Sequence, residues 1–265
     1  MAACRRVLGR ERLPRVKTCL LLALALALGP LAAAADASRT FDPQRLEALG
    51  RAIYDQDRRV AIATDLMLEN HDPEAEGIRG WVVEGDRDGM LVRFVRETGD
   101  GAESVVDARF DETLLPVVSE PTDRSLTPAQ RAQLAARHVA LAHIDHPCTD
   151  RYNSIVLPDP ERDGLLVYAL AASGDSGAML AGGHYRFSVS RDGHALRRAE
   201  ALSAGCAKLA EQGTEHRAVL KSVARTPLET HVFLNLLRKK PLYVSTSDKR
   251  LWKIDNGHMS VVEKK

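Results

Sequence analysis

The chain has 265 residues, of which 45% are hydrophobic and 28% are charged, a composition typical of globular proteins and unlike that of disordered or coiled-coil chains. Its formal net charge of +1 argues against a strongly basic nucleic-acid-binding protein, so we expect no nucleic-acid partner. Aromatic residues make up only 5% of the chain, so the core must consist mainly of Leu, Val, Ile and Ala.

Residues 1–37 have the three parts of a secretory signal peptide. Six basic residues precede an unbroken apolar run over 19–28, and Gly29 and Pro30 end that run before a stretch of small residues. We expect cleavage after Ala35 or Ala37 and an exported mature protein, either periplasmic or secreted. An uncleaved anchor is the alternative, although the apolar run is shorter than the roughly 20 residues of a membrane span. No later segment reaches that length, so we expect no transmembrane segment in the mature chain.

Charge is distributed unevenly after the signal peptide. Residues 38–120 hold 10 basic and 19 acidic side chains, whereas residues 217–265 hold 11 basic and 4 acidic ones. The simpler interpretation is that the two ends neutralise each other in the fold. The alternative is a basic face that binds an anionic surface of the cell envelope.

Residues 38–120 are predicted to form a pair of helices followed by an antiparallel β-meander. Asp42 and Pro43 are typical of a helix start, and a second helical stretch runs from Arg58 to Glu69. Three short strands follow over 80–84, 90–97 and 103–110, with turns rich in Gly and Asp between them. Residues 116–125 are expected to be a connector.

Residues 121–265 are predicted to form a mixed unit with a mostly antiparallel sheet, so the fold class is α+β. Thr127 and Gln130 have the spacing of a capping box for a helix that Pro147 ends. Thr226 and Glu229 have the same spacing at the start of a last helix, which runs to about residue 237. The expected strands are 152–157, 165–172, 184–190, 194–201, 217–223, 241–246 and 251–254.

Two of the four cysteines remain after removal of the signal peptide, Cys148 and Cys206. Because an exported protein folds in an oxidising compartment, we expect a disulfide between them. It would connect the end of the third helix to the hairpin over 184–201. A nucleophilic thiol is the alternative, but neither cysteine has a Cys-His signature around it.

Histidines supply the candidates for chemistry. His138, His143 and His146 could hold a metal, although a polar helix end explains them more simply. His184, Glu229 and His231 form a second candidate polar cluster, in which Glu229 is better explained as a helix-capping residue. No catalytic, cofactor-binding or metal-binding residue is predicted.

Four motifs spread over most of the mature chain resemble a group of uncharacterised exported bacterial proteins. They are Arg151-Tyr152-Asn153, Gly182-Gly183-His184-Tyr185-Arg186-Phe187, Glu229-Thr230-His231-Val232-Phe233 and Leu251-Trp252-Lys253. This resemblance implies no particular activity.

The segment 218–254 resembles the end of JAB/MPN-type metallopeptidase domains. Thr226 to Glu229 stand where that family has the Ser-x-x-Asp that begins a helix, and a strand and a hairpin follow at 241–246 and 250–252. The place of the family's His-x-His pair holds Lys221-Ser222-Val223, and Lys and Ser do not replace imidazoles as zinc ligands. The resemblance therefore implies the fold without the family's metal site.

Together these patterns predict an exported, non-catalytic binding or interaction module of the cell envelope. Its expected partner is another envelope protein or an anionic envelope surface. The alternative is a degenerate or atypical JAB-like metal-dependent hydrolase, which would need a cleft that gathers His184, Glu229 and His231.

Overall fold

The computed structural model describes residues 39–86, 89–99, 101–172, 178–210 and 218–263. The predicted signal peptide lies outside the described residues, and the residues that follow it form one compact unit. Within this described part, three helices combine with four mostly antiparallel sheets, which confirms the α+β class. No helix in it has the length and apolar character that a membrane crossing requires.

The first helix, α1 (Pro43–Leu68), is one continuous helix of 26 residues rather than the predicted pair. Its start is as expected, because the Asp42 carboxylate accepts a hydrogen bond from the Arg45 N–H at 2.9 Å. No Gly or Pro interrupts residues 54–57, and the buried Gln56 keeps the helix packed between Ile53 and Val60. Polar residues in the middle of the helix are therefore no evidence of a break.

The N-terminal sheet confirms the predicted meander and extends it by one strand. Its antiparallel order is β1 (Ile78–Glu84), β2 (Leu91–Thr98), β3 (Gly101–Arg109) and β4 (Val117–Ser119), and β4 lies where a connector was expected. The second half of α1 packs on this sheet, where Val60, Ala63 and Met67 share a core with buried side chains such as Val92 and Phe94.

The second helix, α2 (Pro128–Leu141), begins with the predicted capping box. The Gln130 N–H donates to Thr127 Oγ1 at 3.2 Å, and the Thr127 N–H donates to Gln130 Oε1 at 3.0 Å. The helix lies along the edge strand β1. There the Gln133 amide accepts from the Val83 N–H at 3.0 Å and donates to the Val83 carbonyl at 2.7 Å. This helix therefore satisfies backbone groups that the sheet edge would leave open.

The middle sheet has the antiparallel order β5 (Tyr152–Pro158), β6 (Leu165–Ala171), β8 (Tyr185–Val189) and β9 (Leu196–Ala201). One face packs on α2 through Ala136 and Phe187, and the other packs on α1 through Ile155 and Leu166. Two short strands form a separate antiparallel pair, β7 (Ala178–Leu180) and β10 (Lys208–Ala210). In the sequence, β7 falls between β6 and β8, and β10 follows β9.

The predicted disulfide between Cys148 and Cys206 is confirmed, with the two Cα atoms 5.5 Å apart. Cys148 follows α2 and Cys206 follows β9, so the bond connects the two segments that were expected to meet.

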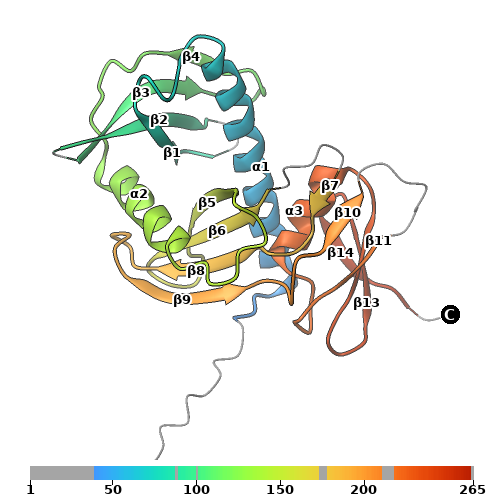
Figure 1. Cartoon of the computed structure of the whole chain (residues 1–265). Helices are drawn as coiled ribbons and strands as arrows, with labels where there is room; N and C mark the ends of the chain where they lie inside the picture. The colour runs from blue at the N-terminus through green and yellow to red at the C-terminus, as the bar shows by residue number, and fades with distance from the viewer. Residues whose placement is uncertain (1–38, 87–88, 100, 173–177, 211–217, 264–265) are drawn as a thin grey trace, which may run out of the picture. The chain divides into compact units, whose positions relative to one another are not determined.

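The C-terminal sheet has the order β11 (Ala218–Lys221), β12 (Leu242–Ser245), β13 (Leu251–Asp255) and β14 (His258–Val261). The first two strands are parallel and are connected by α3 (Glu229–Arg238). Helix α3 packs on the first half of α1, and Figure 1 shows α1 reaching from α3 to the N-terminal sheet. The two helices approach so closely at Gly50 that a Cβ atom there would lie 2.5 Å from the Val232 Cβ.

Candidate functional site

Glu229 does not cap α3, so the role predicted for it is wrong. The N-cap residue is Leu228, and its N–H donates to His231 Nδ1 at 2.9 Å. Glu229 is fully buried, and its Oε1 accepts from Arg186 Nη1 at 2.6 Å. A buried guanidinium left without a carboxylate would cost far more than a missing helix cap, so tertiary pairing decides the role of Glu229.

His184 and His231 are also buried, and each ring accepts a backbone hydrogen bond. The Ala171 N–H donates to His184 Nδ1 at 3.0 Å, as the Leu228 N–H does to His231. Burial lowers the pKa of both imidazoles to about 4, and the charge of His184 opposes protonation of His231 as well. The structure thus gathers the predicted polar cluster in one buried region, as two neutral acceptors beside an ion pair.

The other candidate histidines lie at the surface. His138 Nε2 is 3.3 Å from Glu97 Oε1, and His143 Nδ1 is 2.7 Å from the Val139 carbonyl. His146 is exposed after the end of α2. Among the residues that the structure describes, no three His, Cys, Asp or Glu side chains are grouped as metal ligands.

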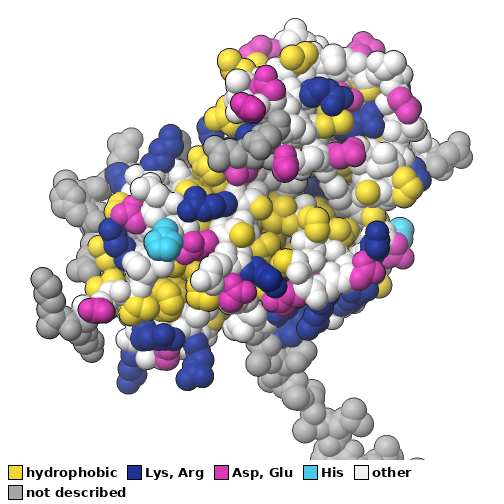
Figure 2. Space-filling model, turned by 180° about the vertical axis from the view of Figure 1, so that it is seen from behind, with side chains coloured by type: hydrophobic (Ala, Val, Ile, Leu, Met, Phe, Trp, Pro, Cys, Tyr) yellow, Lys and Arg dark blue, Asp and Glu magenta, His cyan; other side chains and the backbone are white. Residues whose placement is uncertain are grey.

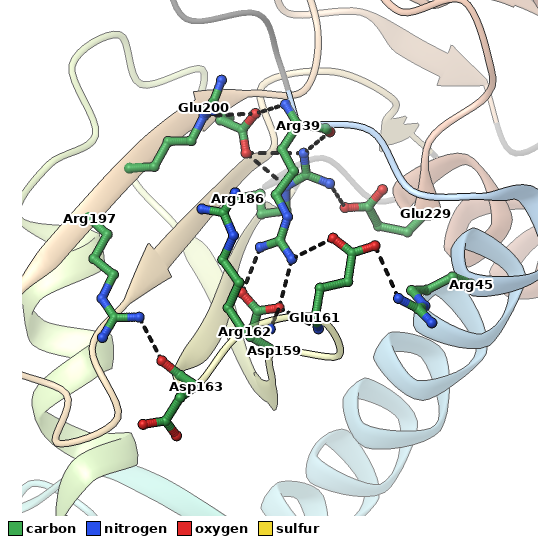
Figure 3. A network of polar contacts seen from close by, with 11 residues as sticks. Arg39, Arg45, Asp159, Glu161, Arg162, Asp163, Arg186, Arg197, Glu200 and Glu229 are labelled. Atoms are coloured by element: carbon green, nitrogen blue, oxygen red, sulfur yellow. Dashed lines mark hydrogen bonds and ion pairs between the residues drawn. The ribbon is translucent and has the colours of Figure 1, made fainter.

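Arg186 is the centre of a buried network that the sequence analysis missed (Figure 3). Its side chain is 0% exposed, and besides Glu229 it donates from Nε to Glu200 Oε2 at 3.0 Å and from Nη2 to the Arg39 carbonyl at 2.5 Å. Alternation along β8 puts Arg186 and Ser188 on the opposite face from Tyr185, Phe187 and Val189, and α1 and α3 cover that face. The usable sequence signal was the opposite charge at the cross-strand position, because Arg186 pairs with Glu200 in the β8–β9 register.

The network continues to the surface through Arg39. Its backbone N–H donates to Glu200 Oε1 at 2.6 Å, and its guanidinium donates to both Asp159 oxygens at 2.6 and 2.7 Å. Glu161 Oε2 accepts from the same guanidinium at 3.0 Å. The Phe41 ring lies 4.6 Å from the Arg39 guanidinium and 5.0 Å from that of Arg186. These contacts fix the start of the described chain to β9 and to the β5–β6 loop.

A groove lies next to the outer end of this network. It has a volume of about 1380 Å³ and is formed by the first turns of α2, the β5–β6 loop and the β8–β9 loop. Its apolar lining includes Ala132, Val156, Leu157, Pro158 and Leu165. Figure 2 shows such a hollow, where hydrophobic side chains gather between charged ones.

Gly193 holds one wall of the groove against α2. Its φ of +83° favours glycine, and a Cβ atom there would clash with the Ala132 carbonyl oxygen. The β8–β9 loop can therefore approach α2 only because this residue has no side chain.

Carboxylates on the groove rim are held by neighbouring donors. Asp159 is bound by Arg39, as described above, and Glu84 Oε2 accepts from Gln130 Nε2 at 2.8 Å. Asp163 Oδ1 lies 3.3 Å from Arg191 Nη1. The Ser190 hydroxyl donates to Asp192 Oδ1 at 2.5 Å, and this bond lowers the pKa of that carboxyl. The rim is thus polar and largely organised before any ligand arrives.

Comparison of the chain with protein-family models, with curated proteins and with solved structures gave no match. The chemistry of the site is therefore inferred from its own geometry.

Proposed function

We propose that the protein is an exported, non-catalytic binding module of the cell envelope and that the groove is its ligand site. The observation that carries this proposal is the combination of an apolar floor with an organised charged rim. Ligand sites in proteins have this composition, with a mostly apolar lining and a few fixed polar groups. We place the partner among the other proteins of the envelope, and an anionic envelope surface is the alternative partner.

Export is supported by two independent features. The first 37 residues have the pattern of a signal peptide, and the mature chain contains the Cys148–Cys206 disulfide. Disulfides form and persist in oxidising compartments, so the bond fits a periplasmic or secreted protein.

We do not extend the proposal to a JAB-like hydrolase. A strand, a helix, a strand and a hairpin follow in the order that the resemblance implies. However, Glu229, at the place of the acidic ligand, forms a buried pair with Arg186. No feature of the described residues favours the metal-dependent alternative over the groove.

Site-specific photo-crosslinking in cells tests the proposal. A photoreactive benzoylphenylalanine at Ala129, an exposed residue on the groove lining, should capture a defined envelope partner. The same group at Leu68, which is 52% exposed and does not line the groove, is the matched control. Equal products from both positions, or none from Ala129, would contradict the groove as a binding site. N-terminal sequencing of the protein from the envelope fraction should begin at Asp36 or Ser38.

A further inference from the structure

The acidic and basic side chains on the groove rim differ in how far they are paired within the protein, and this difference indicates the charge of the ligand. Its four carboxylates, those of Glu84, Asp159, Asp163 and Asp192, each accept from a side-chain donor of the protein itself. Asp159 and Asp163 pair with the cations of Arg39 and Arg191, so only Glu84 and Asp192, whose side-chain donors are neutral, have no cationic partner among these contacts.

Three guanidinium groups on the same rim have no carboxylate partner within the described residues. Arg197 Nη1 donates to the Asp163 backbone carbonyl at 2.6 Å, and Arg131 Nη1 donates to the Leu126 carbonyl. The Arg162 side chain, on the β5–β6 loop, makes no polar contact within that part of the chain. Since a guanidinium carries five N–H donors, most donors of these groups remain open to a ligand.

We infer that the groove binds an extended peptide segment of another protein, in which apolar side chains alternate with at least one carboxylate. This inference rests on the proposed function and names its ligand class. The apolar side chains would lie over Leu157, Pro158 and Leu165, and the carboxylate would meet Arg162 and its neighbours on the rim. Arginine binds carboxylates through paired, charge-assisted hydrogen bonds, which a neutral ligand does not offer.

The size and layout of the groove favour a peptide over a lipid or a small molecule. Its volume of about 1380 Å³ exceeds the range of about 300–1,000 Å³ that is typical of small-molecule pockets. The free arginines come from α2, the β5–β6 loop and β9, so they are spread around the rim. A lipid has one polar end, whereas a peptide presents polar groups along its whole length.

Fluorescence anisotropy with three labelled heptapeptides tests the inference on the mature protein. The probes are Gly-Leu-Xaa-Leu-Xaa-Leu-Gly with Glu, Gln or Lys at both Xaa positions. We expect the Glu probe to bind about tenfold more tightly than the Gln probe, as two charge-assisted contacts would give, and the Lys probe to bind most weakly. The difference between the Glu and Gln probes should shrink as salt is raised.

Two variants and one control assign this binding to the rim. Arg162→Gln and Arg197→Gln should each weaken the Glu probe by about fivefold and leave the Gln probe unchanged. Arg151→Gln removes an exposed arginine outside the groove and should change neither. Ala129→Trp, which fills the groove from the surface of α2, should abolish binding of both the Glu and the Gln probes.

The outcomes separate the ligand class from the function. Equal binding of the Glu and Gln probes, still blocked by Ala129→Trp, would overturn the anionic assignment and leave the groove as a binding site. Binding of phosphatidylglycerol vesicles without binding of the Glu probe at about 1 mM would overturn the peptide assignment in favour of an anionic surface. Absence of all binding, together with no crosslink from Ala129, would overturn the proposed function itself.

Discussion

Replacement of Arg186 by Met should destabilise the mature protein by about 3–5 kcal/mol, the usual cost of removing one partner from a buried ion pair. The magnitude follows from complete burial, because both Arg186 and Glu229 are 0% exposed and Glu200 is 5% exposed. Met occupies a similar volume but leaves the Glu229 carboxylate buried without its cation. For a protein with a typical stability of about 5–15 kcal/mol, this loss is a large fraction of the total.

Urea denaturation followed by far-UV circular dichroism measures this loss. Arg191→Met is the matched control, because it breaks a pair with Asp163 in which both side chains are more than 70% exposed, and we expect a far smaller change. The double variant Arg186→Met/Glu229→Leu should recover part of the lost stability, since it leaves one fewer carboxylate without its cation. An Arg186→Met variant that unfolds at the same urea concentration as the control would refute this reasoning.

Three further outcomes follow. Because burial lowers the pKa of His184 and His231 to about 4 while their unfolded rings titrate near 6.5, the unfolded state binds more protons between these values. Stability should therefore fall as pH drops from about 6.5 to 4, and His184→Asn, which can keep an acceptor for the Ala171 N–H, should flatten that slope in urea titrations at each pH. The disulfide joins residues that are 58 positions apart, so its reduction should lower the free energy of unfolding by on the order of 4 kcal/mol in the same urea titration. An unchanged urea midpoint would contradict a stabilising role for this bond. Gly193→Ala should lower the melting temperature and weaken probe binding, whereas Gly205→Ala, with open space around its Cα, should do neither.

Local patterns were reliable where local physics decides the structure. In the capping box, the side chains of Thr127 and Gln130 accept hydrogen bonds from each other's backbone N–H groups, so α2 begins where the sequence predicts. The same spacing at Thr226 and Glu229 failed, because Arg186, 43 residues away in sequence, takes the carboxylate. The same spacing thus had two outcomes, and tertiary contacts distinguish them.

The groove could not be predicted from the sequence for a related reason. Its lining comes from α2, from the β5–β6 loop and from the β8–β9 loop, which become neighbours only after the middle sheet forms. None of these segments carries a recognisable ligand-binding motif. The role of Arg186 could not be predicted either, since nothing within the hairpin shows that α1 and α3 cover its face of the sheet.

The long first helix has a consequence for the order of folding. Leu46, Leu49 and Ile53, near its start, share a core with Trp252, Ile254 and Met259 of β13 and β14, which lie far away in sequence. Their hydrophobic surface cannot be buried in the native way until the C-terminal sheet has been made and has packed on α1. Contacts at such long range delay folding, because the closure of a long loop must precede their formation. The first half of α1 therefore completes its packing late, whereas its second half packs with the nearby strands of the N-terminal sheet and does not depend on that long loop.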